Sequence, residues 1–179
     1  VLNQQIIEDI CGSAGIGFVK YLFSHNTKYE PMMPFVYQTD HGNSMIALDG
    51  TILNRNFNFC ELVNKINGPL ESFQDYMESL KGTYNLIYID EGKMLIARDP
   101  YGIKPMCFGK LKDTFIAVSE SCALDAMNGE FLQDVEPGTI VLVENGDYSV
   151  HHFSKKPHHL CLFEMIYIAR HDSVIDGVS

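Results

Sequence analysis

The side chains that could carry chemistry gather at a few points of the sequence. A thiol followed directly by glycine, which could act as a nucleophile, occurs once, as Cys11-Gly12. The dipeptide Asp49-Gly50 separates two apolar runs, as either a hairpin turn or the end of a strand beside a site would. Arg98-Asp99 places a cation next to a carboxylate, and Ser119-Glu120-Ser121 places two hydroxyl groups beside a carboxylate. Five further residues could suggest a metal site, namely His151, His152, His158, His159 and Cys161.

Most of these groups have simpler interpretations. Neighbouring residues of a strand point to opposite faces, so the adjacent histidine pairs lack the usual spacing of zinc ligands, and we expect surface histidines. Pairing of Arg98 with a carboxylate at the base of a turn is more often structural than catalytic. The five cysteines are scattered without paired spacings, which favours free thiols over disulfides. The sequence therefore predicts neither a metal nor another cofactor.

Composition limits the classes of function. The chain has 179 residues, of which 46% are hydrophobic, enough for the core of one domain. Its formal net charge of −10 repels nucleic acids and anionic membrane surfaces. No apolar run is long enough to cross a bilayer, and the first residues do not resemble a signal peptide. We therefore expect a cytoplasmic protein.

The central stretch from Asn85 to Asp125 must position the candidate groups, because it is the most regularly patterned part of the chain. Short apolar runs separated by turn residues predict hairpin-linked strands over residues 86–89, 94–97, 106–109 and 115–118. The hydroxyls and carboxylate of Ser119-Glu120-Ser121 predict a cap for a helix that begins at Cys122.

The remaining elements are also mixed. Apolar residues at helical intervals predict helices over residues 60–66 and 70–80. Strands are expected over residues 14–21, 34–37, 45–48, 51–53, 131–135, 139–143 and 148–152. The almost continuous apolar run at residues 160–169 predicts a buried strand or the start of a domain connection. Clustered helices beside runs of antiparallel strands favour a layered α+β fold.

Several long motifs carry a family resemblance. ARDPYGIKP (97–105), SESCALD (119–125), DVEPGTIV (134–141) and CLFEMIYIARHDSVIDGVS (161–179) resemble the glutaminase half of the amidophosphoribosyltransferases. GIGFVKY (15–21) and ALDGTILN (47–54) match the front of that domain in order and spacing, so the resemblance spans nearly the whole chain. That family catalyses the first committed step of purine synthesis.

The resemblance implies a fold and a division of the chain. Class II glutamine amidotransferases of this kind have an N-terminal-nucleophile fold, a four-layer αββα sandwich of two antiparallel sheets, here expected without its N-terminal strands. Residues 1–160 would form a partial glutaminase-like domain. Residues 161–179 would form the segment that in the family leads into a phosphoribosyltransferase domain, which consumes the ammonia released from glutamine.

The resemblance also shows which catalytic groups differ. The family's nucleophile is a Cys-Gly far upstream of the GIGFVKY strand, whereas Cys11 directly precedes that strand, so we expect an ordinary half-buried cysteine. Lys20 stands in place of the arginine that grips the substrate carboxylate, and lacks its planar fork. Asp49 replaces the asparagine that donates to the oxyanion, while Gly50 is retained. Phe59 falls where the family has the aspartate that meets the substrate ammonium.

The C-terminal motif implies contacts between domains. Glu164, Tyr167, Arg170, Asp172 and Ser173 match the family segment that joins the glutaminase and transferase halves, with His171 in place of the usual proline. Cys161 matches one iron–sulfur ligand of a branch of the family, but the other ligands are absent from this sequence, so we expect a buried cysteine there.

Three functions remain open from the sequence. The first is a non-catalytic scaffold or binding module, or a decaying fragment, that pairs with another copy through an open sheet edge or with a phosphoribosyltransferase domain in trans. The second is an active glutamine-hydrolysing subunit that supplies ammonia for phosphoribosylamine synthesis, after cleavage before Cys11 or with a nucleophile from another segment. The third is binding of a small ligand in a vacated pocket lined by Phe18 and Phe59.

Overall fold

Two antiparallel sheets form the framework of the protein, as seen in a computed structural model that describes residues 12–19, 33–39, 42–90 and 92–178. The larger sheet has the strand order β1-β2-β3-β4-β8-β9, and the smaller one has the order β6-β5-β7. The strands of the larger sheet are β1 (Phe35–Thr39), β2 (Gly42–Ile52), β3 (Gly82–Asp90), β4 (Lys93–Arg98), β8 (Thr139–Glu144) and β9 (Asp147–His152). Those of the smaller sheet are β5 (Cys107–Leu111), β6 (Thr114–Val118) and β7 (Glu130–Asp134).

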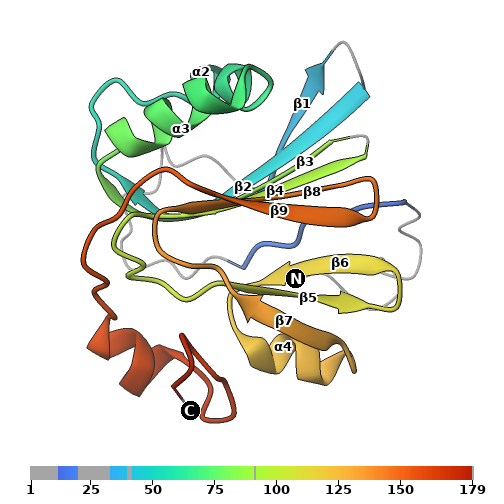
Figure 1. Cartoon of the computed structure of the whole chain (residues 1–179), viewed down its shortest axis with the longest axis vertical. Coiled ribbons are helices and arrows are strands. Elements are labelled where there is room, and N and C mark those ends of the chain that lie inside the picture. Colours follow the sequence, from blue (N-terminus) through green and yellow to red (C-terminus); the bar gives the residue numbers. More distant parts are fainter. Residues whose placement is uncertain (1–11, 20–32, 40–41, 91, 179) are drawn as a thin grey trace.

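The helices cover the outer faces of the two sheets. Helices α2 (Phe59–Ile66) and α3 (Leu70–Ser79) lie over the larger sheet, α4 (Ser121–Ala126) lies against the smaller one, and the two sheets stack between them (Figure 1). The π-helix η1 (Glu164–Ile168) follows β9 near the C-terminus. The predicted four-layer αββα sandwich is therefore confirmed for the described residues. No helix among them has the length and apolarity that a membrane crossing requires.

Apolar periodicity explains both cores. Leu62, Val63 and Ile66 recur on one face of α2 and pack with Phe73 and Met77 of α3 against the larger sheet. A second cluster fills the space between the sheets and contains Ile96, Met106, Phe108, Val135, Val141 and Val143. Burial of these side chains supplies the main force that holds the layers together.

Buried polar groups in the first core have partners. The Tyr84 hydroxyl donates to the Met77 carbonyl at 3.1 Å, and the Tyr88 hydroxyl lies 3.0 Å from Ser44 Oγ. Helix α2 begins after Asn58, whose side chain accepts from the Glu61 N–H at 2.8 Å. The Tyr84 bond joins α3 to the larger sheet, the Tyr88 contact joins β3 to β2, and the Asn58 bond fixes the start of α2.

The connection between β4 and β5 differs from the prediction. The turn residues after Arg98 predicted another hairpin, but β4 belongs to the larger sheet and β5 to the smaller one, so the chain crosses between sheets here. The loop is fixed by Asp99, whose Oδ1 accepts from the Tyr101 and Gly102 N–H groups at 2.8 and 3.0 Å. Turn residues that would also suit a hairpin therefore form the connection between the two sheets here.

Other local predictions were also wrong. Asp49-Gly50 forms neither a hairpin nor a strand end, because β2 continues to Ile52. Residues 14–19 form no strand, and residues 20–21 lie outside the described part of the chain. Residues 164–168 form a π-helix with Ile166, Tyr167 and Ile168 exposed, so the buried strand was wrong and the alternative, a domain connection, stays a prediction. Helix α4 has no side-chain cap, because the groups of Glu120 and Ser121 bond to the C-terminal segment instead.

Gly50 shows why β2 can run unbroken past Asp49. Its φ is +136°, and a Cβ at this position would lie 2.0 Å from the Thr83 carbonyl oxygen on the neighbouring strand. Gly146 shares a positive φ of +79°, but a Cβ there would meet nothing within 4 Å. A comparison of the two positions therefore distinguishes the cost of a side chain at positive φ from the cost of a steric clash.

We expect Gly50→Ala to lower the free energy of unfolding by about 3–5 kcal/mol, because strain and overpacking add. Gly146→Ala should lower it by only about 1–2 kcal/mol, the cost of an L-residue at positive φ. Urea denaturation of both variants measures the difference. Equal losses would show that the close approach of β2 to β3 does not require a glycine.

Candidate functional site

A cavity of about 320 Å³ lies between the two sheets beside Asp49. Strand β2 contributes Ala47 and Asp49, and β3 contributes Asn85 and Ile87. The opposite wall comes from β6, from the start of α4 and from the segment that precedes β1. The remaining lining residues are Gly17, Phe18, Val19, Met106, Ala117, Val118, Ser119 and Ala123. The cavity is thus mostly apolar, with its polar groups supplied by the larger sheet and by Ser119.

An ion pair is the main electrostatic feature at the rim of this cavity. Lys104 Nζ lies 3.1 Å from Asp49 Oδ1 and 3.0 Å from Oδ2. The Lys104 and Asp49 side chains are 30% and 45% exposed, so water screens the pair. An ionised carboxylate accepts hydrogen bonds and donates none, so Asp49 offers no donor to a developing oxyanion.

Glu164 of η1 lies close to this pair. Burial raises the pKa of its carboxyl group; Asp49 and Glu120 act in the same direction, and Lys104 acts against them. The Glu164 carboxyl group therefore lies within electrostatic range of the ion pair at the rim. Sequence positions 49, 104 and 164 are brought together by the fold alone.

Asn85 is the polar group in the wall that sequence reasoning missed. It is 5% exposed, and its Nδ2 donates to the Pro105 carbonyl at 2.7 Å. Its Oδ1 has no hydrogen-bond partner within the described residues. The one signal in the sequence was an amide in an otherwise apolar strand, between Tyr84 and Leu86.

The other predicted substrate positions are dispersed. Gly50 pairs with Tyr84 across β2 and β3. Phe59 opens α2 and packs on Phe35 and Phe57, with ring centroids 4.9 and 5.0 Å apart, so it does not line the cavity. Phe18 does line it. Cys11 and Lys20 lie outside the described residues.

The residues matched to the domain connection lie together on the C-terminal segment. Tyr167 is 77% exposed, Glu164 is half-buried and Ser173 is buried. Arg170 Nη2 lies 2.8 Å from Asp172 Oδ2 in an exposed ion pair, which lowers the pKa of Asp172. The segment therefore has one side toward the body of the protein and one side toward solvent.

The histidines and cysteines do not form a metal centre in the described part of the chain, where no group of three His, Cys, Asp or Glu side chains is arranged to hold an ion. Cys60, Cys107, Cys122 and Cys161 are free thiols. Cys161 is half-buried rather than buried as expected. Arg98 acts to lower the pKa of Cys107, but burial of the thiol outweighs it and raises that pKa, so Cys107 is not an activated nucleophile.

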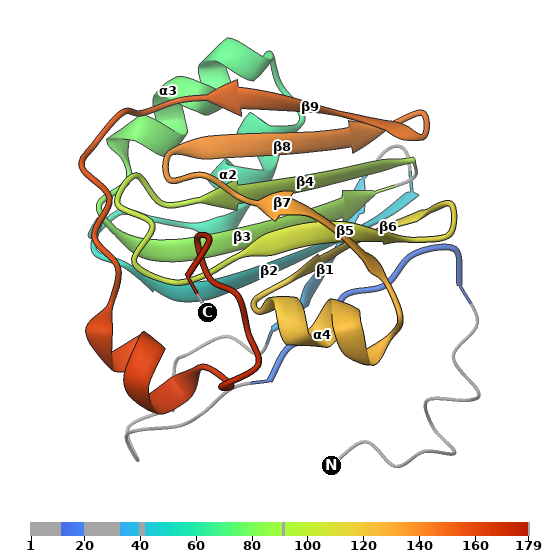
Figure 2. The ribbon, with the colours of Figure 1, turned by 60° about the horizontal axis from the view of Figure 1, so that its bottom comes forward.

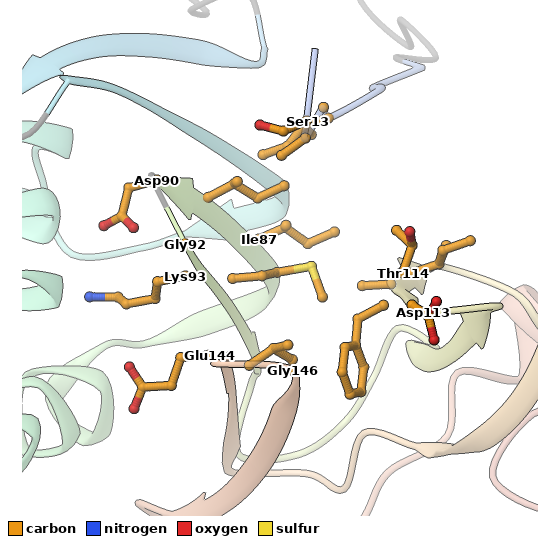
Figure 3. Close-up of a pocket in the computed structure, with 18 of the residues that line it drawn as sticks. Ser13, Ile87, Asp90, Gly92, Lys93, Asp113, Thr114, Glu144 and Gly146 are labelled. Carbon is orange, nitrogen blue, oxygen red and sulfur yellow. The ribbon is translucent and has the colours of Figure 1, made fainter.

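A larger cavity of about 480 Å³ lies between the sheets at the hairpin ends (Figure 3). The side chains of Asp90, Lys93 and Glu144 point away from the space between the sheets, whereas Ile87 points into it. Lys93 instead donates to the Ile66 carbonyl at the end of α2. This cavity therefore presents an apolar wall and backbone without an arrangement of reactive groups.

The stacked antiparallel sheets, the outer helices and the cavity beside β2 define the class of protein. A family model described as a glutamine amidotransferase domain matches residues 26–126, more than half of the chain. The chain belongs to the family of glutamine amidotransferase domains.

Named relatives narrow the resemblance to amidophosphoribosyltransferases. The amidophosphoribosyltransferase of Archaeoglobus fulgidus is 32% identical over all of this chain, which covers 44% of that protein. The one from Mycobacterium tuberculosis is 33% identical over all of this chain, which covers 39% of it. This chain thus spans less than half the length of these relatives. The family resemblance predicted from the motifs is confirmed.

A solved structure supports the same conclusion. The glutamine phosphoribosylpyrophosphate amidotransferase from Bacillus subtilis, solved in complex with ADP and GMP, superposes with a TM-score of 0.77 at 25% identity. The match covers 90% of this chain and 40% of that one. The two-sheet framework is therefore shared over nearly the whole length of this chain.

The buried and exposed thiols should differ in reactivity. Burial, reinforced by Asp134, raises the pKa of Cys107 to about 12, and only a thiolate reacts readily with iodoacetamide. At pH 8 we expect alkylation of exposed Cys60 and none of Cys107, followed by mass mapping of peptides. Alkylation in denaturant is the control, where both should react. Equal rates in the folded protein would contradict the burial of β5.

Proposed function

We propose that this chain is a glutaminase-like domain of the amidophosphoribosyltransferase family without glutaminase activity, which acts as a binding or regulatory part. The observation that carries the proposal is the Asp49–Lys104 ion pair at the rim of the cavity. In the family, position 49 supplies a donor to the oxyanion of the tetrahedral intermediate. Here that position holds an acceptor that is already bound to a cation.

The chemistry of glutamine hydrolysis explains the expected loss. Attack on the amide carbon places negative charge on the carbonyl oxygen, and a carboxylate nearby raises the energy of that state. Removal of one oxyanion donor typically costs about 10²–10³ in rate. Two of the three N–H donors of Lys104 are engaged by the Asp49 carboxylate, so the pair offers at most one side-chain donor where the family has the asparagine amide.

The substrate-binding positions support the same proposal. Phe59 packs into an aromatic cluster with Phe35 and Phe57, so it provides no anion for the ammonium of glutamine. From the sequence, Lys20 lacks the planar fork for the carboxylate, and Cys11 is placed too close to the GIGFVKY motif for the family's nucleophile. Loss of several groups that act as one unit removes catalysis even where each alone would reduce it.

The partner that fits best is a phosphoribosyltransferase domain, attached after residue 179 or supplied in trans. Residues 161–179 would then be the connection and residues 1–160 the glutaminase-like domain. Support comes from large apolar side chains exposed on one segment, namely Leu162, Phe163, Ile166, Tyr167 and Ile168. Contiguous apolar surface of this kind is typical of an interface. A cytoplasmic location belongs to the same proposal and is supported by the four free thiols.

A glutamine-analogue electrophile tests the proposed inactivity. We expect no mass adduct after incubation of the chain with diazo-oxo-norleucine, and no release of glutamate from glutamine, because no cysteine among the described residues lines the cavity. Intact-mass spectrometry and a coupled glutamate assay measure both. Cys11→Ala is the matched variant that shows whether any adduct sits on that residue. One adduct on Cys11 with a free α-amine, together with glutamate release, would establish an active glutaminase instead.

A further inference from the structure

Three polar side chains from neighbouring strands lie in a row on the inner face of the larger sheet. The register pairs Asp49 of β2 with Asn85 of β3, and Asn85 with Arg98 of β4. Residues paired directly across two strands carry their side chains on the same face of a sheet. Tyr84 and Leu86, on either side of Asn85, belong to the core beneath α2 and α3, so the row faces the smaller sheet instead. Asp49 and Asn85 therefore line the cavity side by side.

The amide of Asn85 leaves one acceptor unused. Its Nδ2 donates to the Pro105 carbonyl at 2.7 Å. Because a carbonyl oxygen can only accept, this bond fixes which atom of the amide is the nitrogen and directs Oδ1 away from the loop that contains Pro105. Oδ1 is buried and has no partner among the described residues. A buried acceptor without a donor is unfavourable, so a bound molecule that brings an N–H group to this wall would be stabilised by it.

Arg98, the third member of the row, is not available to a ligand. Its fully buried guanidinium binds the Asp176 carboxylate through Nη1 and Nη2 at 2.6 and 2.8 Å. The remaining donors bind the carbonyls of Lys104, Val135 and Gly102 at 2.7–2.8 Å. Asp176 belongs to the C-terminal turn, residues 175–178, which Figure 2 shows as a small hairpin close to the smaller sheet. Each N–H of the guanidinium thus already has an acceptor.

The cavity offers acceptors and a negative charge. Asp49 is the one charged side chain in the part of its lining that the structure describes. Lys104, at the rim, has two of its three donors engaged by that carboxylate. The pair is part-exposed, and pairs of this kind are weak, so a second cation can compete with Lys104 for Asp49. A cationic ligand is therefore favoured over an anionic one.

The walls of the cavity suit an apolar body. Apart from Asp49, Asn85 and Ser119, its described lining consists of apolar side chains and a glycine. The cavity adjoins the larger one, because Gly17, Ile87 and Ala117 line both. A molecule with its polar end at Asp49 therefore has apolar walls for the rest of its length. Apolar walls with a few polar groups that fix orientation are typical of sites for small molecules.

We propose that the cavity beside Asp49 binds a small primary amine. The ammonium group lies between the Asp49 carboxylate and Asn85 Oδ1, in competition with Lys104, and the alkyl or aryl body lies between the sheets. The inference rests on the proposed function, because it names the ligand of a domain that binds and does not hydrolyse. Glutamine fits less well, since its carboxylate meets Asp49 and no basic side chain of the described lining.

A matched series of small molecules tests the ligand class. In ligand-observed NMR titrations of the whole chain at pH 7, pentylamine should bind about tenfold more tightly than pentanol, and pentanoate more weakly than either, because charge-assisted hydrogen bonds favour the cation. From propylamine to pentylamine the affinity should rise about threefold to fourfold per methylene, as apolar surface is buried. Equal binding of pentylamine and pentanol, tighter binding of pentanoate, or no binding of pentylamine would overturn the amine site.

Two variants of the ion pair should change amine binding in opposite directions. Asp49→Asn removes the charge at constant shape and should weaken pentylamine binding about tenfold. Lys104→Met removes the competing cation, keeps the backbone carbonyl that accepts from Arg98, and should strengthen binding about twofold to fivefold. Asp172→Asn is the matched control, because it makes the same change at an exposed pair on another segment, and it should leave binding unchanged. Changes of the same sign in Asp49→Asn and Lys104→Met would overturn the proposed position of the ammonium group.

Two variants inside the cavity test its other walls. Asn85→Leu removes the unused acceptor at similar volume and should weaken pentylamine binding about fivefold or more. Ala123→Leu fills space beside the smaller sheet and should weaken pentylamine and pentanol alike. Unchanged pentylamine binding in either variant would place the amine outside this cavity. Because Asn85→Leu leaves the Pro105 carbonyl without its donor and could prevent folding, the part-exposed Asp49 and Lys104 variants decide the test in that case.

The amine site and the proposed inactivity fail separately. Release of glutamate from glutamine would overturn the proposed inactivity, whichever small molecules bind. Absence of pentylamine binding without glutamate release would overturn the amine site and leave the proposed inactivity in place.

Discussion

The structure depends on one buried charge, the guanidinium of Arg98. It ends β4 at the point where the chain leaves the larger sheet for the smaller one, and no water reaches it. Such a charge is tolerated only when it is paired and its donors are bound, and loss of the partner of a buried pair costs about 3–5 kcal/mol. The crossover loop, the end of β7 and the C-terminal turn all supply these acceptors. Arg98 therefore contacts both sheets and the C-terminal turn at the same time.

The same loop also builds the cavity wall. The Lys104 carbonyl accepts from Arg98 Nε, while the Lys104 side chain reaches Asp49 on β2. The next carbonyl, that of Pro105, orients the Asn85 amide. Because consecutive residues of one rigid loop serve the buried charge and the cavity, the geometry of the rim follows from the packing beneath it. Neither the ion pair nor the amide needs a flexible loop to place it.

The local sequence pattern predicted most helices and strands. It could not predict which residues far apart in the sequence pair with one another. Helical spacing found α2 and α3, and turn residues found β4 to β6 within about two residues, whereas β3 begins at Gly82, well before the predicted start at residue 86. The turn residues around Asp99, however, predict only that the chain reverses. They do not predict which sheet the next strand joins. The Arg98–Asp176 pair spans 78 residues and the Asp49–Lys104 pair spans 55, so no window of sequence reveals either. Glu120 was assigned to a cap because its true partners lie in a distant segment.

The two ion pairs separate stability from chemistry. Arg98–Asp176 is buried and hydrogen-bonded throughout, so removal of either partner alone would leave an uncompensated buried group. Asp49–Lys104 is part-exposed, and pairs of that kind contribute roughly 0–1 kcal/mol. A carboxylate at position 49 is therefore nearly neutral for the scaffold, yet it places an acceptor paired with Lys104 in the wall of the cavity. The polar groups at the rim can therefore differ while the Arg98 network keeps the two sheets and the C-terminal segment together.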